Sequence, residues 1–197
     1  MPKMTAQHLA DRRDQILDAA VACFAERGYH GSSMRDLIAG AGLSAGAIYH
    51  YFPGKDAILL ALAERDLARF RALVSSLRAA GDARRALSSL VDEVFGGLGR
   101  PDARHAARLA TTVLAEAAVN PATATPVRAL HDAWRVELAA LVGSAGTSSL
   151  APDAVAAGLV HLHQGALAAL AIGEPVDAQA LAALARTLLG LSAEASR

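Results

Sequence analysis

The stretch Ser33–Lys55, SMRDLIAGAGLSAGAIYHYFPGK, decides the fold that we expect for this chain. Ser33 and Asp36 have the S-x-x-D spacing of a capping box, in which two side chains satisfy the free amides of a helix start. Gly42 is the residue expected where a helix ends in a left-handed turn. Ser44 can cap a second helix directly afterwards. The stretch therefore predicts two short helices joined by a tight turn.

The second helix of this stretch combines an apolar face with small residues at its start. Ile48 and Phe52 share one side of the helix. Gly46, Ala47 and His50 must therefore point the opposite way. Small side chains allow a helix to enter the major groove of DNA closely. The pattern favours a helix-turn-helix, although capped helix pairs also occur in many other bundles.

The rest of the chain also reads as helices. Of its 197 residues, 53% are hydrophobic and only 4% are aromatic. A sequence rich in Ala, Leu and Arg favours helices over strands. Clusters of glycine and proline delimit expected helices near 5–27, 82–96, 101–119, 125–142, 152–172 and 177–191. An apolar pattern without Gly or Pro continues from Lys55 to about residue 80. We predict an all-α fold of about nine helices, with a helix-turn-helix unit at 1–54 joined by that continuous helix to a bundle at 55–197.

Charge and cysteine content limit the possible functions. The formal net charge is +0, and acids also balance bases within residues 1–60, which counts against DNA binding unless basic groups cluster locally. Cys23 is the only cysteine, so it forms no intramolecular disulfide, and core packing is the better interpretation. The N-terminus has no apolar run typical of a signal peptide. We expect a soluble, cytoplasmic protein.

The segment at residues 12–59 carries the motifs of a known family. It reads RRDQILDAAVACFAERGYHGSSMRDLIAGAGLSAGAIYHYFPGKDAIL, with AA…F…G, S-M-R-D, AG-L-S, G-x-I-Y and F-x-x-K-D in order. These motifs closely resemble the N-terminal signature of TetR-like (TetR/AcrR-type) transcriptional regulators. The remaining helices fit that family's ligand-binding and dimerisation domain by count and spacing. The resemblance implies a repressor that binds a palindromic double-stranded DNA operator as a homodimer and is released by a small-molecule effector.

The resemblance also implies particular DNA contacts. Phosphate contacts fall on Ser33, Tyr49, Tyr51 and Lys55, and base-edge contacts fall on Arg35, Ala45, Gly46, Ala47 and His50. Ser44, as a helix cap, would bring free amides toward a phosphate. Ala45 stands where the family commonly has a long polar or basic residue. Recognition of the DNA sequence should therefore depend on Arg35, His50 and DNA shape. In the alternative interpretation, the two tyrosines pack in the core and Arg35 forms an exposed ion pair.

A polar stripe and a tryptophan are the candidates for effector binding. They lie on two consecutive helices, at His105, Arg108, Thr112 and Glu116 and then at His131 and Trp134. One interpretation is a stripe that lines a cavity capped by Trp134. The other is an ordinary solvated helix face.

Two stripes near the C-terminus are candidates for a dimer interface. The residues are Gly158, Leu162, Gly165, Ala169 and Ile172 on one helix, and Leu181, Leu184 and Leu188 on the next. Such stripes suit close packing between helices. They could equally complete the core of a single chain.

Catalytic and metal-binding patterns are missing from the sequence. It contains no G-x-S-x-G elbow, no glycine-rich phosphate loop and no H-E-x-x-H, so we expect no catalytic residues and no cofactor. His161 and His163 point roughly 200° apart on a helix and cannot share a metal ion. The alternative functions are a helical adaptor that binds only protein, or an enzyme without a recognisable motif.

Overall fold

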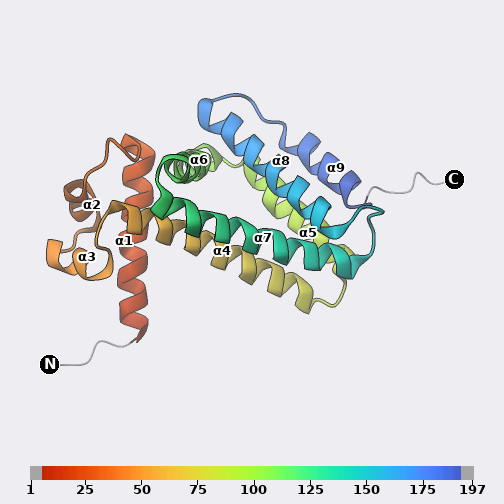
Figure 1. Ribbon diagram of the computed structural model, residues 1–197, viewed down its shortest axis with the longest axis horizontal. Coiled ribbons are helices and arrows are strands. Elements are labelled where there is room, and N and C mark those ends of the chain that lie inside the picture. Colours follow the sequence, from red (N-terminus) through yellow and green to blue (C-terminus); the bar gives the residue numbers. More distant parts are fainter. Residues whose placement is uncertain (1–5, 192–197) are drawn as a thin grey trace.

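The computed structural model describes residues 6–191, which form nine α-helices and no strand. The helices are α1 (Ala6–Arg27), α2 (Met34–Ala41), α3 (Ala45–Tyr51), α4 (Lys55–Ala79), α5 (Ala83–Gly96), α6 (Ala103–Val119), α7 (Pro121–Ala145), α8 (Pro152–Ile172) and α9 (Ala178–Leu188), with a 3-10 turn at Gly97–Gly99 after α5. The predicted all-α fold is confirmed. Figure 1 shows α1, α2 and α3 gathered at one end of the molecule and the larger bundle at the other.

The start of α7 departs most from the expected boundaries. Two prolines predict a break before a helix near residue 125, but α7 already begins at Pro121. Proline suits the first helical position, where its missing amide would have no partner, and Asn120 caps the helix by accepting from the amide of Ala122 at 3.1 Å. Pro126 then removes a single helical hydrogen bond. Its neighbours Thr123 and Val127 are both buried, and their packing holds the helix through that position.

The helices α1, α2 and α3 share one core with the beginning of α4. Leu37 from α2, Ile48 from α3 and Ile58 from α4 are wholly buried in it. Each such side chain contributes about 1.5–3 kcal/mol by leaving water. Val113 of α6 and Val127 of α7 belong to the same cluster of buried residues. The N-terminal helices, which we call the head, are therefore packed directly onto the larger bundle.

The long helix α4 belongs to both parts of the molecule. Its first turns place Ile58 and Leu62 in the core of the head, and Val74 near its other end lies in the core of the bundle. The helix is unbroken over 25 residues, as the sequence predicts. At 1.5 Å per residue it spans roughly 38 Å.

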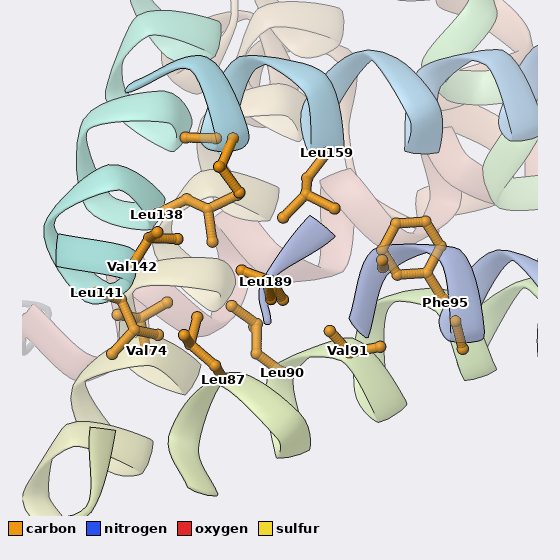
Figure 2. Close-up of a cluster of buried hydrophobic side chains, with 14 of the residues drawn as sticks. Val74, Leu87, Leu90, Val91, Phe95, Leu138, Leu141, Val142, Leu159 and Leu189 are labelled. Carbon is orange, nitrogen blue, oxygen red and sulfur yellow. The ribbon is translucent and has the colours of Figure 1, made fainter. Parts of the chain in front are cut away.

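The second core lies between α4, α5, α7, α8 and α9. In Figure 2, side chains from these helices point toward one another, among them Val74, Leu87, Leu90, Leu138, Leu159 and Leu189. Leu87, Leu141 and Leu189 are essentially shielded from water. Beside this cluster the helices do not meet completely, and a cavity remains.

Candidate nucleic-acid interface and internal cavity

The helix pair α2 and α3 is capped as the sequence predicts. Ser33 Oγ accepts from the amide of Asp36 at 3.2 Å, and the Asp36 carboxylate accepts from the amide of Ser33 at 2.8 Å, so the capping box is complete. Gly42 ends α2 with a φ of 64°, in the left-handed region. Ser44 Oγ accepts from the amide of Ala47 at 3.2 Å and starts α3. Local chemistry therefore sets the angle between the two helices.

Near the start of α2, the ion pair of Asp36 is formed with a residue other than Arg35. Asp36 forms its ion pair with Arg27, at 2.7 Å. Hydrogen bonds from Ser33 lower the pKa of Asp36, and Arg27 acts in the same direction. Arg35 is exposed and forms no hydrogen bond or ion pair with any residue that the structure describes. The alternative in which an ion pair holds Arg35 is therefore not the arrangement found.

The outer face of α3 is made of small, accessible residues. Ala45, Gly46 and His50 are exposed, and Tyr49 is 50% exposed, while Ile48 on the opposite face is fully buried. A Cβ added at Gly46 would meet nothing within 4 Å. A surface of this kind allows another molecule to approach the helix backbone closely.

Tyr51 requires a correction. Its hydroxyl is buried without a hydrogen-bond partner in the described part of the chain, and its ring packs against the core of the head. Tyr51 follows Ile48 by three residues, so the helical period turns both toward the core. The expected phosphate contact does not fit this geometry at Tyr51, whereas Tyr49 remains accessible.

Lys55 is also placed differently from the expectation. Its ammonium donates to the carbonyl oxygens of Tyr29 at 2.6 Å and Ser32 at 2.8 Å, and lies 4.3 Å from the centre of the Tyr29 ring. Ser32 is itself buried and donates through Oγ to the carbonyl of Gly28 at 2.6 Å. Lys55 thus fastens the loop that leads into α2. This internal role occupies two of the three donors of its ammonium.

Replacing Lys55 with Met is expected to lower the free energy of unfolding by about 1–3 kcal/mol, because two carbonyl groups lose their donor. Chemical denaturation of the full chain measures this loss. Arg35→Ala is the matched control, since Arg35 has no protein partner among the described residues and should leave stability nearly unchanged. Equal stability of the two variants would contradict the fastening role.

The cavity has a volume of about 420 Å³, lies between α4, α5, α7 and α8, and is partly open to solvent at the exposed Asp66 and Arg69. Its wall is largely apolar, with Phe70 and Leu73 from α4, Leu90, Val91 and Phe95 from α5, and Trp134, Leu138, Leu159 and Val160 from α7 and α8. Polar groups come from Asp66, Arg69, Glu93, His163 and Gln164. Such a volume is within the usual range of small-molecule sites.

Trp134 lines the cavity, as the sequence suggests, but the polar stripe of α6 does not. His105 and Arg108 are exposed. Thr112 donates to the carbonyl of Arg108 at 2.8 Å within its own helix. Glu116 lies 3.8 Å from His30, at the contact between α6 and the head. None of the four lines the cavity: His105 and Arg108 fit a solvated face, whereas the Glu116 side chain is only 12% exposed because the head covers it.

His131 stands just behind the cavity wall. Its ring stacks on Trp134 with centroids 5.3 Å apart, and the amide of Gln164 approaches its ring nitrogens at 3.3 and 3.4 Å. Desolvation lowers the pKa of His131, although Asp132 acts in the opposite direction. His131 thus helps to position two residues of the cavity, Trp134 and Gln164, and does not line it itself.

Two polar residues of the cavity were not singled out as effector ligands from the sequence. His163 packs edge-on against Phe95, and desolvation lowers its pKa to about 4. Asp66 is exposed at the edge of the cavity, and desolvation of its carboxyl group raises its pKa, opposed in part by Arg69 and Arg65. Spacing along α8 could not reveal the role of His163, because it depends on which faces of α5 and α8 meet.

The C-terminal stripes are divided between the core and the surface. Leu162, Leu181 and Leu188 pack in part against the second core. Gly158 and Gly165 are exposed, Ile172 is 74% exposed and Leu184 is 46% exposed. Ala169 is half-buried. An apolar surface along α8 and the start of α9 therefore stays uncovered in one copy of the chain.

Comparison with known proteins identifies the N-terminal segment. Residues 16–62 match the family described as bacterial regulatory proteins, tetR family. A repressor of the HTH type from Mycobacterium tuberculosis is 51% identical over 75 residues, 38% of this chain and 40% of that protein. The regulator UidR of Escherichia coli is 31% identical over 123 residues, 60% of this chain and 58% of UidR. The alignments thus cover less than two thirds of these relatives.

Solved structures extend the similarity of fold along the chain. A TetR-family transcriptional regulator from Rhodococcus sp. has a TM-score of 0.77 at 26% identity, over 91% of this chain and 99% of its own. A regulator from Saccharomonospora viridis, solved in complex with choline, has a TM-score of 0.74 at 23% identity, over 93% of this chain and 97% of its own. Residues 16–62, which include the capped helix pair, therefore belong to the tetR family of bacterial regulatory proteins, and the chain as a whole shares the fold of solved TetR-family regulators.

Proposed function

We propose that this protein is a transcriptional repressor that binds a palindromic operator through α2 and α3 and is released by a small molecule. The observation that carries the proposal is the outer face of α3, where Ala45, Gly46 and His50 are exposed on a helix anchored by the buried Ile48. Arg35, in the first turn of the capped α2, is exposed as well. The protein would act in the cytoplasm, where bacterial DNA lies.

The DNA contacts that we propose are few. Arg35 can bind guanine with two hydrogen bonds, and His50 can reach a base edge. Ala45 and Ala47 offer only methyl groups, which suit thymine. Tyr49, Ser33 and the first amides of α2 are available for phosphates. Because net charge is +0, general electrostatic attraction is weak, and DNA shape should carry part of the specificity.

We further propose that the functional unit is a homodimer formed along α8 and α9. One helical head offers too little contact area for specific operator binding, so two are needed. α8 is long and apolar enough to cross a membrane by composition, yet only 22% of its apolar window is buried within the chain. It packs against α6 and α7 on one side. A second copy covering the other side explains this exposed apolar surface without a membrane.

The proposed release mechanism uses α4 as a lever between a DNA-binding domain at 1–54 and a ligand domain at 55–197. Two half-sites lie about 34–36 Å apart, so a small tilt of one head misaligns it when the other is docked. An effector in the cavity would favour the tilt that fits it. The expected coupling is about 1–3 kcal/mol, and operator DNA must weaken effector binding by the same factor.

Arg35→Ala is expected to cost about 1–3 kcal/mol of operator binding and to relax the preference at one base pair in each half-site. A direct base contact is lost, while the fold is unaffected. Competition titrations against single-base operator variants measure both effects. Equal loss of affinity for operator and for random DNA would show that Arg35 contacts only the backbone.

Retardation of a DNA fragment from the region upstream of the protein's own gene tests the proposal. The assay is run at low salt with an excess of unrelated competitor DNA, because non-specific binding depends strongly on salt. Retention of the fragment against competitor supports a repressor. If the competitor DNA displaces all of the protein from the fragment, specific DNA binding at that region is contradicted.

A further inference from the structure

We propose that the cavity selects an uncharged, largely apolar molecule with a single hydrogen-bonding oxygen, such as an aliphatic alcohol or ketone, and that His163 binds that oxygen. This inference rests on the proposed function in one respect, namely that the cavity holds the effector. It adds the chemical class of the effector and the residue that recognises it.

The wall of the cavity favours an apolar body. Phe70, Leu90, Phe95 and Leu159 project into it from three helices, and aromatic and aliphatic groups make up most of its lining. Figure 2 shows Leu90, Phe95 and Leu159 on facing helices. Each methylene group of a ligand that is buried here adds about 0.8 kcal/mol to the binding free energy. The wall therefore favours a ligand with an alkyl chain.

The charges at the cavity balance one another. Asp66 and Arg69 both lie on α4 and both line the cavity. Glu93 is paired with Arg100 at 2.7 Å, outside the lining. No net charge is therefore left for an ionic ligand. A carboxylate or ammonium group would lose hydration against a largely apolar wall in which Arg69 already acts on Asp66 and Glu93 is paired with Arg100, which is unfavourable.

Two polar groups of the wall have no hydrogen-bond partner among the described residues: the buried Nε1 of Trp134, which can only donate, and the imidazole of His163. His163 forms no hydrogen bond with the residues that the structure describes, whereas the other polar side chain of α8 in the wall, Gln164, is directed at His131. Its ring rests edge-on against Phe95, with centroids 5.9 Å apart. An imidazole in this position can donate one hydrogen bond or accept one from an uncharged ligand.

The protonation state of His163 agrees with this role. Desolvation lowers its pKa to about 4, so the ring is neutral at pH 6–8. The other titratable groups of the cavity are Asp66 and Arg69 on α4 and Glu93 on α5, with His131 behind Gln164 on α7. A neutral ring neither attracts an anion nor repels a cation, so recognition rests on the hydrogen bond.

Tryptophan fluorescence provides the test, because the chain has one tryptophan, Trp134, and it lines the cavity. The full chain is titrated with octan-1-ol, octanoate and octyltrimethylammonium, which share one alkyl chain and differ in charge. We expect octan-1-ol to bind about 10-fold more tightly than either ion, with constant affinity from pH 8 to pH 6. Tighter binding of either ion, or no response to any of the three, overturns the inference.

Substitutions of His163 test whether it forms the hydrogen bond to the ligand oxygen. His163→Leu should weaken octan-1-ol about 10-fold, while His163→Gln, which keeps a donor and an acceptor, should recover most of that loss. His161→Gln is the matched control, because His161 is exposed on the same helix and lies outside the cavity wall. Equal affinities of the wild type and His163→Leu would contradict the role of His163.

DNA retardation on the same samples separates this inference from the proposed function. A protein that retains its DNA fragment but prefers an ion in the cavity contradicts the ligand class alone. A protein that binds octan-1-ol through His163 but never binds DNA specifically contradicts the repressor and leaves the assigned ligand chemistry supported.

Discussion

An Ile48→Ala variant is expected to lose about 2–5 kcal/mol of stability in the head and to stop binding DNA at temperatures where the wild type binds. Ile48 is fully buried and anchors α3, whose opposite face is the proposed DNA contact, in the core that it shares with α1, α2 and α4. Its removal leaves a cavity under a helix of only seven residues. Denaturation and DNA titration of the full chain measure the two losses.

A graded series and an exposed control sharpen this test. Ile48→Val should cost about 0.5–1.5 kcal/mol and weaken DNA binding only slightly at low temperature. Val136→Ala, on α7 with 67% of its side chain exposed, should change neither quantity. An Ile48→Ala protein with wild-type stability and DNA affinity would mean that α3 is not positioned by this contact.

A double variant, Ile172→Arg with Leu184→Arg, is expected to be monomeric and to bind a two-half-site operator about 10²–10⁴-fold more weakly. These side chains are the most exposed apolar residues of the proposed interface, at 74% and 46%. Two positive charges on each copy would repel across a symmetric contact. Light scattering gives the mass, and titration gives the affinity.

The matched control for this prediction is Val136→Arg, which adds charge to an exposed apolar site outside the proposed interface. It should remain dimeric. Affinity for a duplex that contains one half-site should be the same for the double variant and the wild type, since each head is intact. A dimeric double variant would exclude these residues from the interface.

The head could be predicted from the sequence in detail, because its structure depends on local chemistry. The capping box of Ser33 and Asp36, the left-handed Gly42 and the cap at Ser44 all act within four residues along the chain. The buried face of Ile48 and Phe52 follows from the helical period alone. Wherever one short segment contains all the interacting groups, the sequence is sufficient.

Lys55 and Tyr51 show where this reasoning stops. The ammonium of Lys55 meets two carbonyl groups more than twenty residues earlier in the chain, at Tyr29 and Ser32. Nothing in the local sequence indicates that contact. The resemblance implies a phosphate contact at Tyr51, but its ring packs against the core of the head.

The cavity could not be predicted because its lining comes from four different helices. The α6 stripe has the spacing of a lining, yet His105 and Arg108 face the solvent. His163 was considered only as a metal ligand with His161. Its place beside Phe95 requires the packing of α5 against α8, which periodicity within one helix does not determine.

Selection of binding sites from a random pool of duplex DNA tests the central claim most directly. The full-length protein is incubated with the pool, bound duplexes are recovered through several rounds at fixed salt, and the enriched sequences are read. A dimer with one α3 in each major groove predicts an inverted repeat whose half-sites are centred about one helical turn, or a multiple of one turn, apart. Failure to enrich any sequence, or enrichment of a single unrepeated motif, would contradict a dimeric operator-binding repressor.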